Sequence, residues 1–121
     1  MNQNQNREMT LNEKVEAMRA EMQKGQYVHT FREPVQWEGK TYASLSFDFE
    51  ALKGADALKI EAEMDALGMH PAVRKLDMNY QMRVASRSCG EKLGVDFFES
   101  LPIGDFEKIL ARVQGFLLRA E

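Results

Sequence analysis

Residues 27–49 read YVHTFREPVQWEGKTYASLSFDF, and the pattern of this stretch decides the fold. Aromatic and histidine side chains occupy every second position over residues 27–31, which is the period of a β-strand. Apolar and polar side chains alternate again over residues 41–47. Glu38-Gly39 lies between the two runs and predicts a tight turn in which the glycine takes a positive φ. We therefore expect a β-hairpin.

The two strands are not equally regular. Pro34 has no amide hydrogen to donate to a ladder, so we expect an edge or a bulge at that position. In the second strand the alternation predicts one shared face for Thr41, Ala43, Leu45 and Phe47. A two-stranded hairpin is marginally stable alone, so it must pack against helices or against another chain.

Beyond Phe49 the apolar period changes from 2 to 3.6, which predicts helices for the rest of the chain. One helix is expected over residues 54–68. A second should begin with Pro71 in its first turn and end near residue 89. A short turn before Pro102 precedes a terminal helix. The fold class is therefore α+β: a two-stranded antiparallel hairpin followed by a small helical bundle, with an extra N-terminal helix.

The expected helices differ in how much apolar surface they carry. The terminal helix, with Asp105 as its expected N-cap, should close the core with one stripe: Phe106, Ile109, Leu110, Val113, Phe116 and Leu117. The helix before it should have neighbours on both sides, because it carries two stripes: Val73, Leu76, Tyr80 and Val84 on one, and Met78, Met82, Ala85 and Cys89 on the other.

Residues 1–25 are expected to form a unit distinct from the domain of residues 26–121. The first residues are polar and predict a disordered start. From Thr10 an amphipathic helix is expected, and Gly25 should end it. Its apolar side chains form a narrow stripe, which we call the seam: Leu11, Val15, Met18 and Met22. So narrow a stripe is typical of contact with one partner, and methionine adapts well to irregular surfaces. We expect the seam to bind a second copy of the chain, a client protein or its own domain.

Composition excludes several classes of protein. The chain has 121 residues with a formal net charge of −3, which argues against a nucleic-acid binder held by phosphate attraction. Cys89 is the single cysteine, so no intrachain disulfide is expected, as suits a reducing cytoplasm. The polar N-terminus has no apolar signal region, and no apolar run reaches the roughly 18 residues that a membrane span needs. A cytoplasmic protein is expected.

The residues indicate no catalytic site, no cofactor and no metal. Neither histidine is placed near Cys89 by any pattern, and the acidic residues of the helix at 54–68 point to different sides. Arg83 and Arg87 lie one turn apart; they either cover the edge of the core or form a basic patch that meets an acidic helix, in this chain or another. Trp37 is either an anchor for a partner or the lid of the hairpin's own core.

The order and spacing of several short words resembles the tail assembly chaperones of long-tailed bacteriophages, in particular the Mu-like group and its prophage relatives. The likeness covers residues 26–118 and rests on four groups of residues. These are Pro34-Val35, Gly39, Tyr42 and Leu45 in the hairpin; the step LKGAD at residues 52–56; Tyr80 and Ala85 in the middle helix; and Leu101-Pro102, Asp105-Phe106, Ile109, Val113 and Phe116-Leu117 at the end. Lys53 stands where the family has threonine, and residues 1–25 precede the family's usual start.

The resemblance implies a non-catalytic protein that keeps the tape-measure protein soluble while tail tube subunits polymerise around it. Such proteins act in the cytoplasm of the bacterial host and are generally absent from the finished virion. Some are also made in a longer, frameshifted form. The alternative is a small structural or adaptor subunit that stays in a phage-tail-like particle. The implied partners are the tape-measure and tube proteins, and a homo-oligomer is the further expectation. Neither nucleic acid nor membrane is expected as a partner.

Overall fold

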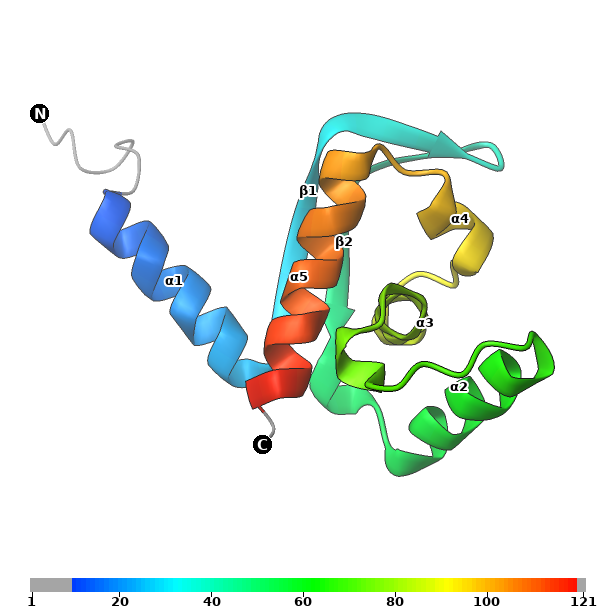
Figure 1. Ribbon diagram of the computed structural model, residues 1–121. Helices are drawn as coiled ribbons and strands as arrows, with labels where there is room; N and C mark the ends of the chain where they lie inside the picture. Colours follow the sequence, from blue (N-terminus) through cyan, green and yellow to red (C-terminus); the bar gives the residue numbers. More distant parts are fainter. Residues whose placement is uncertain (1–9, 120–121) are drawn as a thin grey trace, which may run out of the picture.

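The computed structural model describes residues 10–119, and of residues 21–24 it describes only the backbone. Figure 1 shows the hairpin, the helices that cover one side of it and an N-terminal helix that stands apart. In chain order the elements are α1 (Leu11–Lys24), β1 (Gln26–Trp37), β2 (Lys40–Asp48), η2 (Phe49–Ala51), α2 (Gly54–Ala66), η3 (Arg74–Leu76), α3 (Met78–Ser88), α4 (Val95–Glu99) and α5 (Ile103–Arg119). The expected α+β architecture is confirmed.

The hairpin turns where the sequence predicts, and it is strongly bent. Glu38 and Gly39 take positive φ values of 47° and 82°. The pairing of Thr30 with Ser44 gives way to the pairing of Val35 with Tyr42, so residues 31–34 of β1 oppose a single residue of β2. This bulge contains the proline, as expected. Figure 1 shows the tip folded over toward α4 above the body of the hairpin.

The bend corrects the expected face of the second strand. Leu45 and Phe47 are buried, but Thr41 and Ala43 are exposed. Tyr42 instead turns inward and meets Phe97 edge to face, with ring centroids 5.8 Å apart. The irregular pairing changes which side of the tip faces the helices, so simple alternation fails beyond the bulge.

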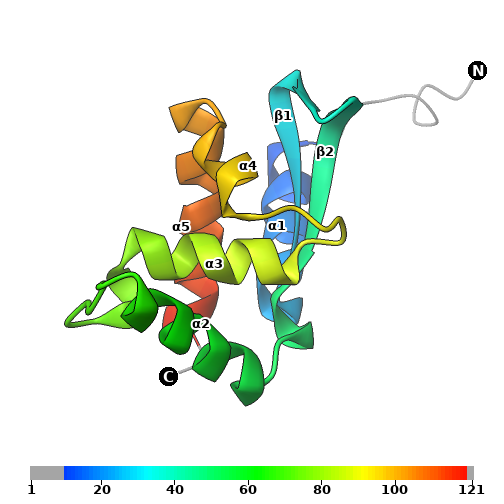
Figure 2. The ribbon, with the colours of Figure 1, turned by 90° about the vertical axis from the view of Figure 1, so that its right-hand side faces the viewer.

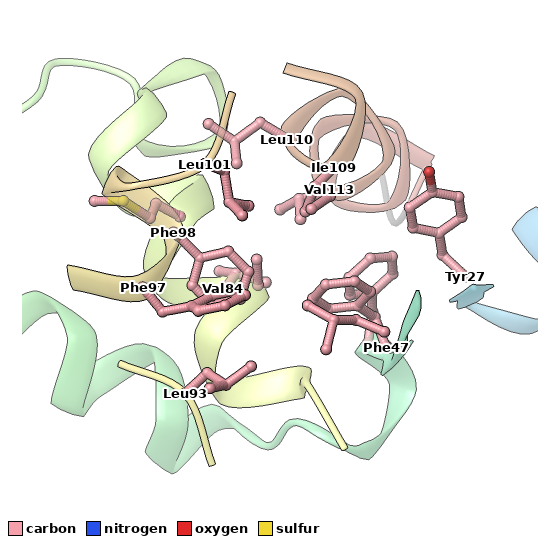
Figure 3. Packing of buried hydrophobic residues seen from close by; sticks show 14 of the residues in the cluster. Tyr27, Phe47, Val84, Leu93, Phe97, Phe98, Leu101, Ile109, Leu110 and Val113 are labelled. Atoms are coloured by element: carbon pink, nitrogen blue, oxygen red, sulfur yellow. The ribbon is translucent and has the colours of Figure 1, made fainter. Parts of the chain in front are cut away.

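The core lies between the hairpin and α3, α4 and α5. Figure 3 shows the rings of Phe97 and Phe98 from α4 meeting side chains of α3 and α5, with Phe47 contributed by the hairpin. Phe97, Phe98, Ile109 and Val113 have no exposed surface. Helix α3 contacts α2, α4, α5 and β2, which confirms that it has neighbours on more than one side (Figure 2).

Two helix starts differ from the expectation. Helix α3 begins at Met78, because the Asp77 carboxylate accepts the Tyr80 amide and caps the helix there, 2.9 Å away. Pro71 lies in the preceding loop, so Val73 and Leu76 are not part of a helical stripe, and both are exposed. Helix α5 begins at Ile103, which makes Asp105 a buried residue of the first turn and not its N-cap.

The terminal helix supplies core as expected, most strongly in its middle. Ile109, Leu110 and Val113 are buried, while Phe106, Phe116 and Leu117 are half-buried at its margins. Phe116 lies against Phe49, with ring centroids 5.3 Å apart. This end of α5 lies beside the start of β1, at the root of α1 (Figure 1).

Candidate protein-binding surface on helix α1

Helix α1 has a well-defined start. The Thr10 amide donates to the Glu13 carboxylate at 2.7 Å, and the Glu13 amide donates to the Thr10 hydroxyl at 3.1 Å. These two bonds form a capping box, which satisfies amides that the first turn would otherwise leave unpaired. An exposed ion pair between Arg19 and Glu16, 3.2 Å apart, adds a small contribution along the helix. Local interactions thus favour the helix before any packing does.

The side chains of α1 face solvent to an unusual extent. Over residues 11–20 every side chain except that of Glu13 is exposed. The seam residues Leu11, Val15 and Met18 are 76%, 40% and 46% exposed. The side chain of Met22, the fourth expected member, lies outside the described residues. Figure 1 shows the helix approaching the rest of the protein only near its C-terminal end, beside β1 and α5.

The root of α1 is fixed by Gly25. This residue takes a φ of +68°, which L side chains rarely adopt. A Cβ at this position would lie 2.5 Å from Cγ of Glu50 and 3.1 Å from Cε1 of Phe116. The Phe49 amide donates to the Gly25 carbonyl at 2.8 Å. The chain therefore leaves the helix through a tightly packed turn and enters β1 directly.

Trp37 lies in the protein's own core margin. The half-buried indole meets the Phe97 ring edge to face, with centroids 5.5 Å apart. Of the two readings of this residue, the structure matches the lid of the hairpin's core. Trp37 is the last residue of β1, whereas α1 joins the first residues of that strand.

Arg83 and Arg87 meet an acidic helix, and that helix is α2 of the same chain. Nε of the buried Arg83 lies 2.9 Å from Glu63, and its Nη1 donates to the Asn79 carbonyl at 3.1 Å. Arg87 donates twice to Asp56, at 2.8 and 3.0 Å. The Lys53 amide and this arginine hold the pKa of Asp56 below its ordinary value. These cations fasten α2 to α3, so a partner reaches Arg83 only if the two helices separate.

A buried polar network links the hairpin to α5, and sequence reasoning missed it. Nε2 of His29 lies 2.8 Å from the Asp105 carboxylate, and Nδ1 lies 2.6 Å from the Tyr27 hydroxyl. The Arg32 amide also donates to Asp105, at 3.4 Å. Because a carboxylate only accepts, Nε2 of His29 must carry a proton. The odd-numbered alternation of β1 places the ring inside, but no local signal names a partner 76 positions away.

Cys89 is a partly buried thiol beside the edge of β2. It forms an isolated antiparallel bridge with Phe47, and the following Gly90 amide donates to the Ser46 carbonyl at 2.9 Å. Burial raises the pKa of the Cys89 thiol. His29 bonds to Asp105 and His70 to Asp65, and among the described residues neither ring bonds to this thiol.

No protein-family model, curated protein or solved structure matches this chain. Within residues 10–119, no group of three or more histidine, cysteine, aspartate or glutamate side chains is arranged to hold a metal ion. In the same range no helix has both the length and the apolar character to cross a bilayer. The exposed apolar side chains of the seam on α1 are the surface on which we base a functional proposal.

Proposed function

We propose that the protein is a non-catalytic binding protein that holds an apolar segment of another protein against α1. The observation that carries this proposal is the exposure of Leu11, Val15 and Met18 on a helix whose surroundings are almost entirely solvent. A helix of 14 residues is marginal in water without tertiary contacts, because too few hydrogen bonds offset the cost of nucleation. A bound partner supplies the missing contacts.

The chemistry of the seam suits an extended or helical apolar client. A leucine, a valine and a methionine give a contact surface of mixed shape, and the thioether adapts to irregular neighbours. Charged residues flank the seam, among them Lys14, Glu16 and Arg19, and they confine the apolar contact to one side. A client with an apolar stripe and a polar opposite face fits this arrangement, as in other helix-in-groove recognition.

On the resemblance set out above, we propose that the protein is a phage or prophage tail assembly chaperone. Its client is then the tape-measure protein, which it keeps soluble in the bacterial cytoplasm while the tube protein polymerises. Helix α1 precedes the part of the chain that resembles the family, so the role of the seam is proposed for this chain alone. In the absence of client, a second copy of the chain covers the seam.

Co-expression with the tape-measure protein of the same phage or prophage tests this function. The wild-type chain should raise the soluble fraction of the tape-measure protein and copurify with it. Val15→Asp/Met18→Asp places two charges in the seam and should abolish both effects. Ala17→Asp/Ala20→Asp is the matched control, because both alanines are exposed on the opposite side of the same helix. It should behave as the wild type does.

Two results would count against the proposal. If the seam variant and the control variant lost equal amounts of soluble, copurifying tape-measure protein, the seam would have no special role. Retention of the protein in purified particles would favour the structural or adaptor subunit over the chaperone. A tube gene just upstream and a long tape-measure gene just downstream would agree with the chaperone.

A further inference from the structure

A pocket lies at the root of α1, where the start of β1 meets η2 and the C-terminal half of α5. Its cavity volume is about 80 Å³, well below that of pockets for drug-sized ligands. Its walls include the rings of Tyr27, Phe49 and Phe116, and the backbone of Gly25 and Gly115 also lines it. Figure 3 shows the Tyr27 ring at the edge of the core, beside α5. The exposed surface of the lining is therefore mostly apolar.

Two arginines also line the pocket, and they differ in how they are paired. Arg119 donates to Glu50 at 3.2 Å, and its guanidinium lies 5.3 Å from the centroid of the Phe116 ring. Arg112 places its guanidinium carbon 4.4 Å from the centroid of the Tyr27 ring. Nη1 of Arg112 is buried, and within the described part of the chain it has no hydrogen-bond partner. A buried donor of a charged group left without an acceptor is costly.

The missing acceptor defines the ligand chemistry. A guanidinium prefers a carboxylate or a phosphate, to which it donates in a fork. The apolar lining favours the carboxylate on an apolar stem, because a phosphate has more charge to desolvate in an apolar pocket. The small volume suits a single side chain. An acidic side chain flanked by apolar residues meets all three conditions.

We propose that this pocket binds an acidic side chain of the client, with Arg112 as the cation that pairs with its carboxylate. The claim that the bound side chain belongs to a client rests on the proposed function, whereas the preference for a carboxylate rests on the pocket alone. Because the pocket adjoins Gly25, a client held along α1 can place an acidic residue in it without leaving the molecule's surface. The seam then supplies apolar contact with the client, and the pocket fixes the position of the client segment along α1.

NMR titration of the full chain with two blocked tripeptides tests the site. The first is leucine–glutamate–leucine, and the second carries glutamine in place of glutamate. The glutamate peptide should shift the backbone amides of Gly25, Gly115 and Phe116 and the Nε–Hε resonance of Arg112. The glutamine peptide should bind at least fivefold more weakly, since it lacks the charge that pairs with the guanidinium. Equal affinity for the two peptides, or no saturable shift in this region, would overturn the proposal.

Variants on α5 separate the pocket from general charge effects. Arg112→Leu should lose the preference for glutamate, while Lys108→Leu removes the same charge from an exposed position of the same helix and should keep it. Arg112→Lys retains the charge without the fork and should keep a weaker preference, which serves if the leucine variant does not fold. If Arg112→Leu still preferred the glutamate peptide over the glutamine peptide, the peptide would bind at a site other than this pocket.

The seam variant keeps the two proposals distinguishable. Val15→Asp/Met18→Asp should bind the glutamate tripeptide as the wild type does, because neither residue lines the pocket. Loss of client capture with normal tripeptide binding would point to the seam alone. Normal client capture with no preference for the glutamate peptide would refute the proposed acidic-side-chain site and would leave the chaperone proposal intact.

Discussion

The buried pair of His29 and Asp105 shows how single residues join distant parts of this chain. A carboxylate is rarely buried unless it is paired, and here it accepts from an imidazole and from the Arg32 amide. The Tyr27 hydroxyl completes the set on the other ring nitrogen. Together these bonds satisfy polar groups of β1 and α5 that would otherwise be costly inside the protein.

Asp105→Ala should destabilise the protein by about 1–3 kcal/mol, because it leaves the His29 ring with a buried donor and no acceptor. Urea denaturation followed by circular dichroism measures the change. Asp96→Ala is a useful comparison, since that carboxylate bonds only locally to the Phe97 amide. A loss at Asp105 no greater than that at Asp96 would mean that the network contributes little.

The thiol of Cys89 should react slowly. Burial raises its pKa, so at a given pH a smaller fraction is thiolate than in a free cysteine, and the thiolate is the reactive form. The midpoint of the pH–rate profile for iodoacetamide should therefore lie at higher pH in the native protein than in the unfolded chain. The same thiol in the urea-unfolded chain is the control, with a lower midpoint. Coincident midpoints would show that the fold does not perturb this group.

Individual residues also mark the limit of what the sequence predicts. The turn at Gly39 and the disruption at Pro34 follow from local backbone chemistry and were predicted. Tyr42 was assigned to the wrong face, because the bulge before it changes a register that alternation assumes to be constant. Asp105 was predicted as a helix cap from its neighbours, whereas its partner comes from β1. Local sequence rules fail at these residues because contacts with distant parts of the chain determine the orientation of their side chains.

At the scale of elements, α5 has its core contacts concentrated in the middle of its length. Ile109 is fully buried, while Ile103 on the same helix is 74% exposed. Ile109→Ala should cost about 2–5 kcal/mol through lost burial and the cavity left behind. Ile103→Ala should change stability by less than about 0.5 kcal/mol, as is usual for exposed positions. If the denaturant midpoints of the two variants were nearly the same, Ile109 would not be part of the stabilising core.

The pairing of α2 with α3 was only partly predictable. The sequence shows an acidic helix and two arginines one turn apart, which were expected either to cover the core edge or to meet an acidic helix of this chain or another. The pairs Arg83–Glu63 and Arg87–Asp56 select it. The start of α3 was missed because Pro71 is an acceptable first helical residue, while the Asp77 cap lies further along. The seam of α1 was predicted from spacing, but its exposure is visible only in the structure.

At the scale of the whole molecule, the contrast between a packed body and an exposed helix predicts self-association. The full chain should form a homo-oligomer in light scattering, because pairing of seams removes apolar surface from water. Val15→Asp/Met18→Asp should lower the subunit count, and Ala17→Asp/Ala20→Asp should leave it unchanged. A monomeric wild type, or an unchanged count in the seam variant, would show that α1 is not the contact between copies.

Hydrogen exchange of α1 tests the central claim, that the seam is a protein-binding face, most directly. Amides of residues 11–24 should exchange slowly in a purified complex with the tape-measure protein and faster in the seam variant alone, where no partner covers the helix. Amides of the α5 core report on global stability and should exchange alike in both. Fast exchange of residues 11–24 within a stable complex, with protection confined to other elements, would contradict the claim.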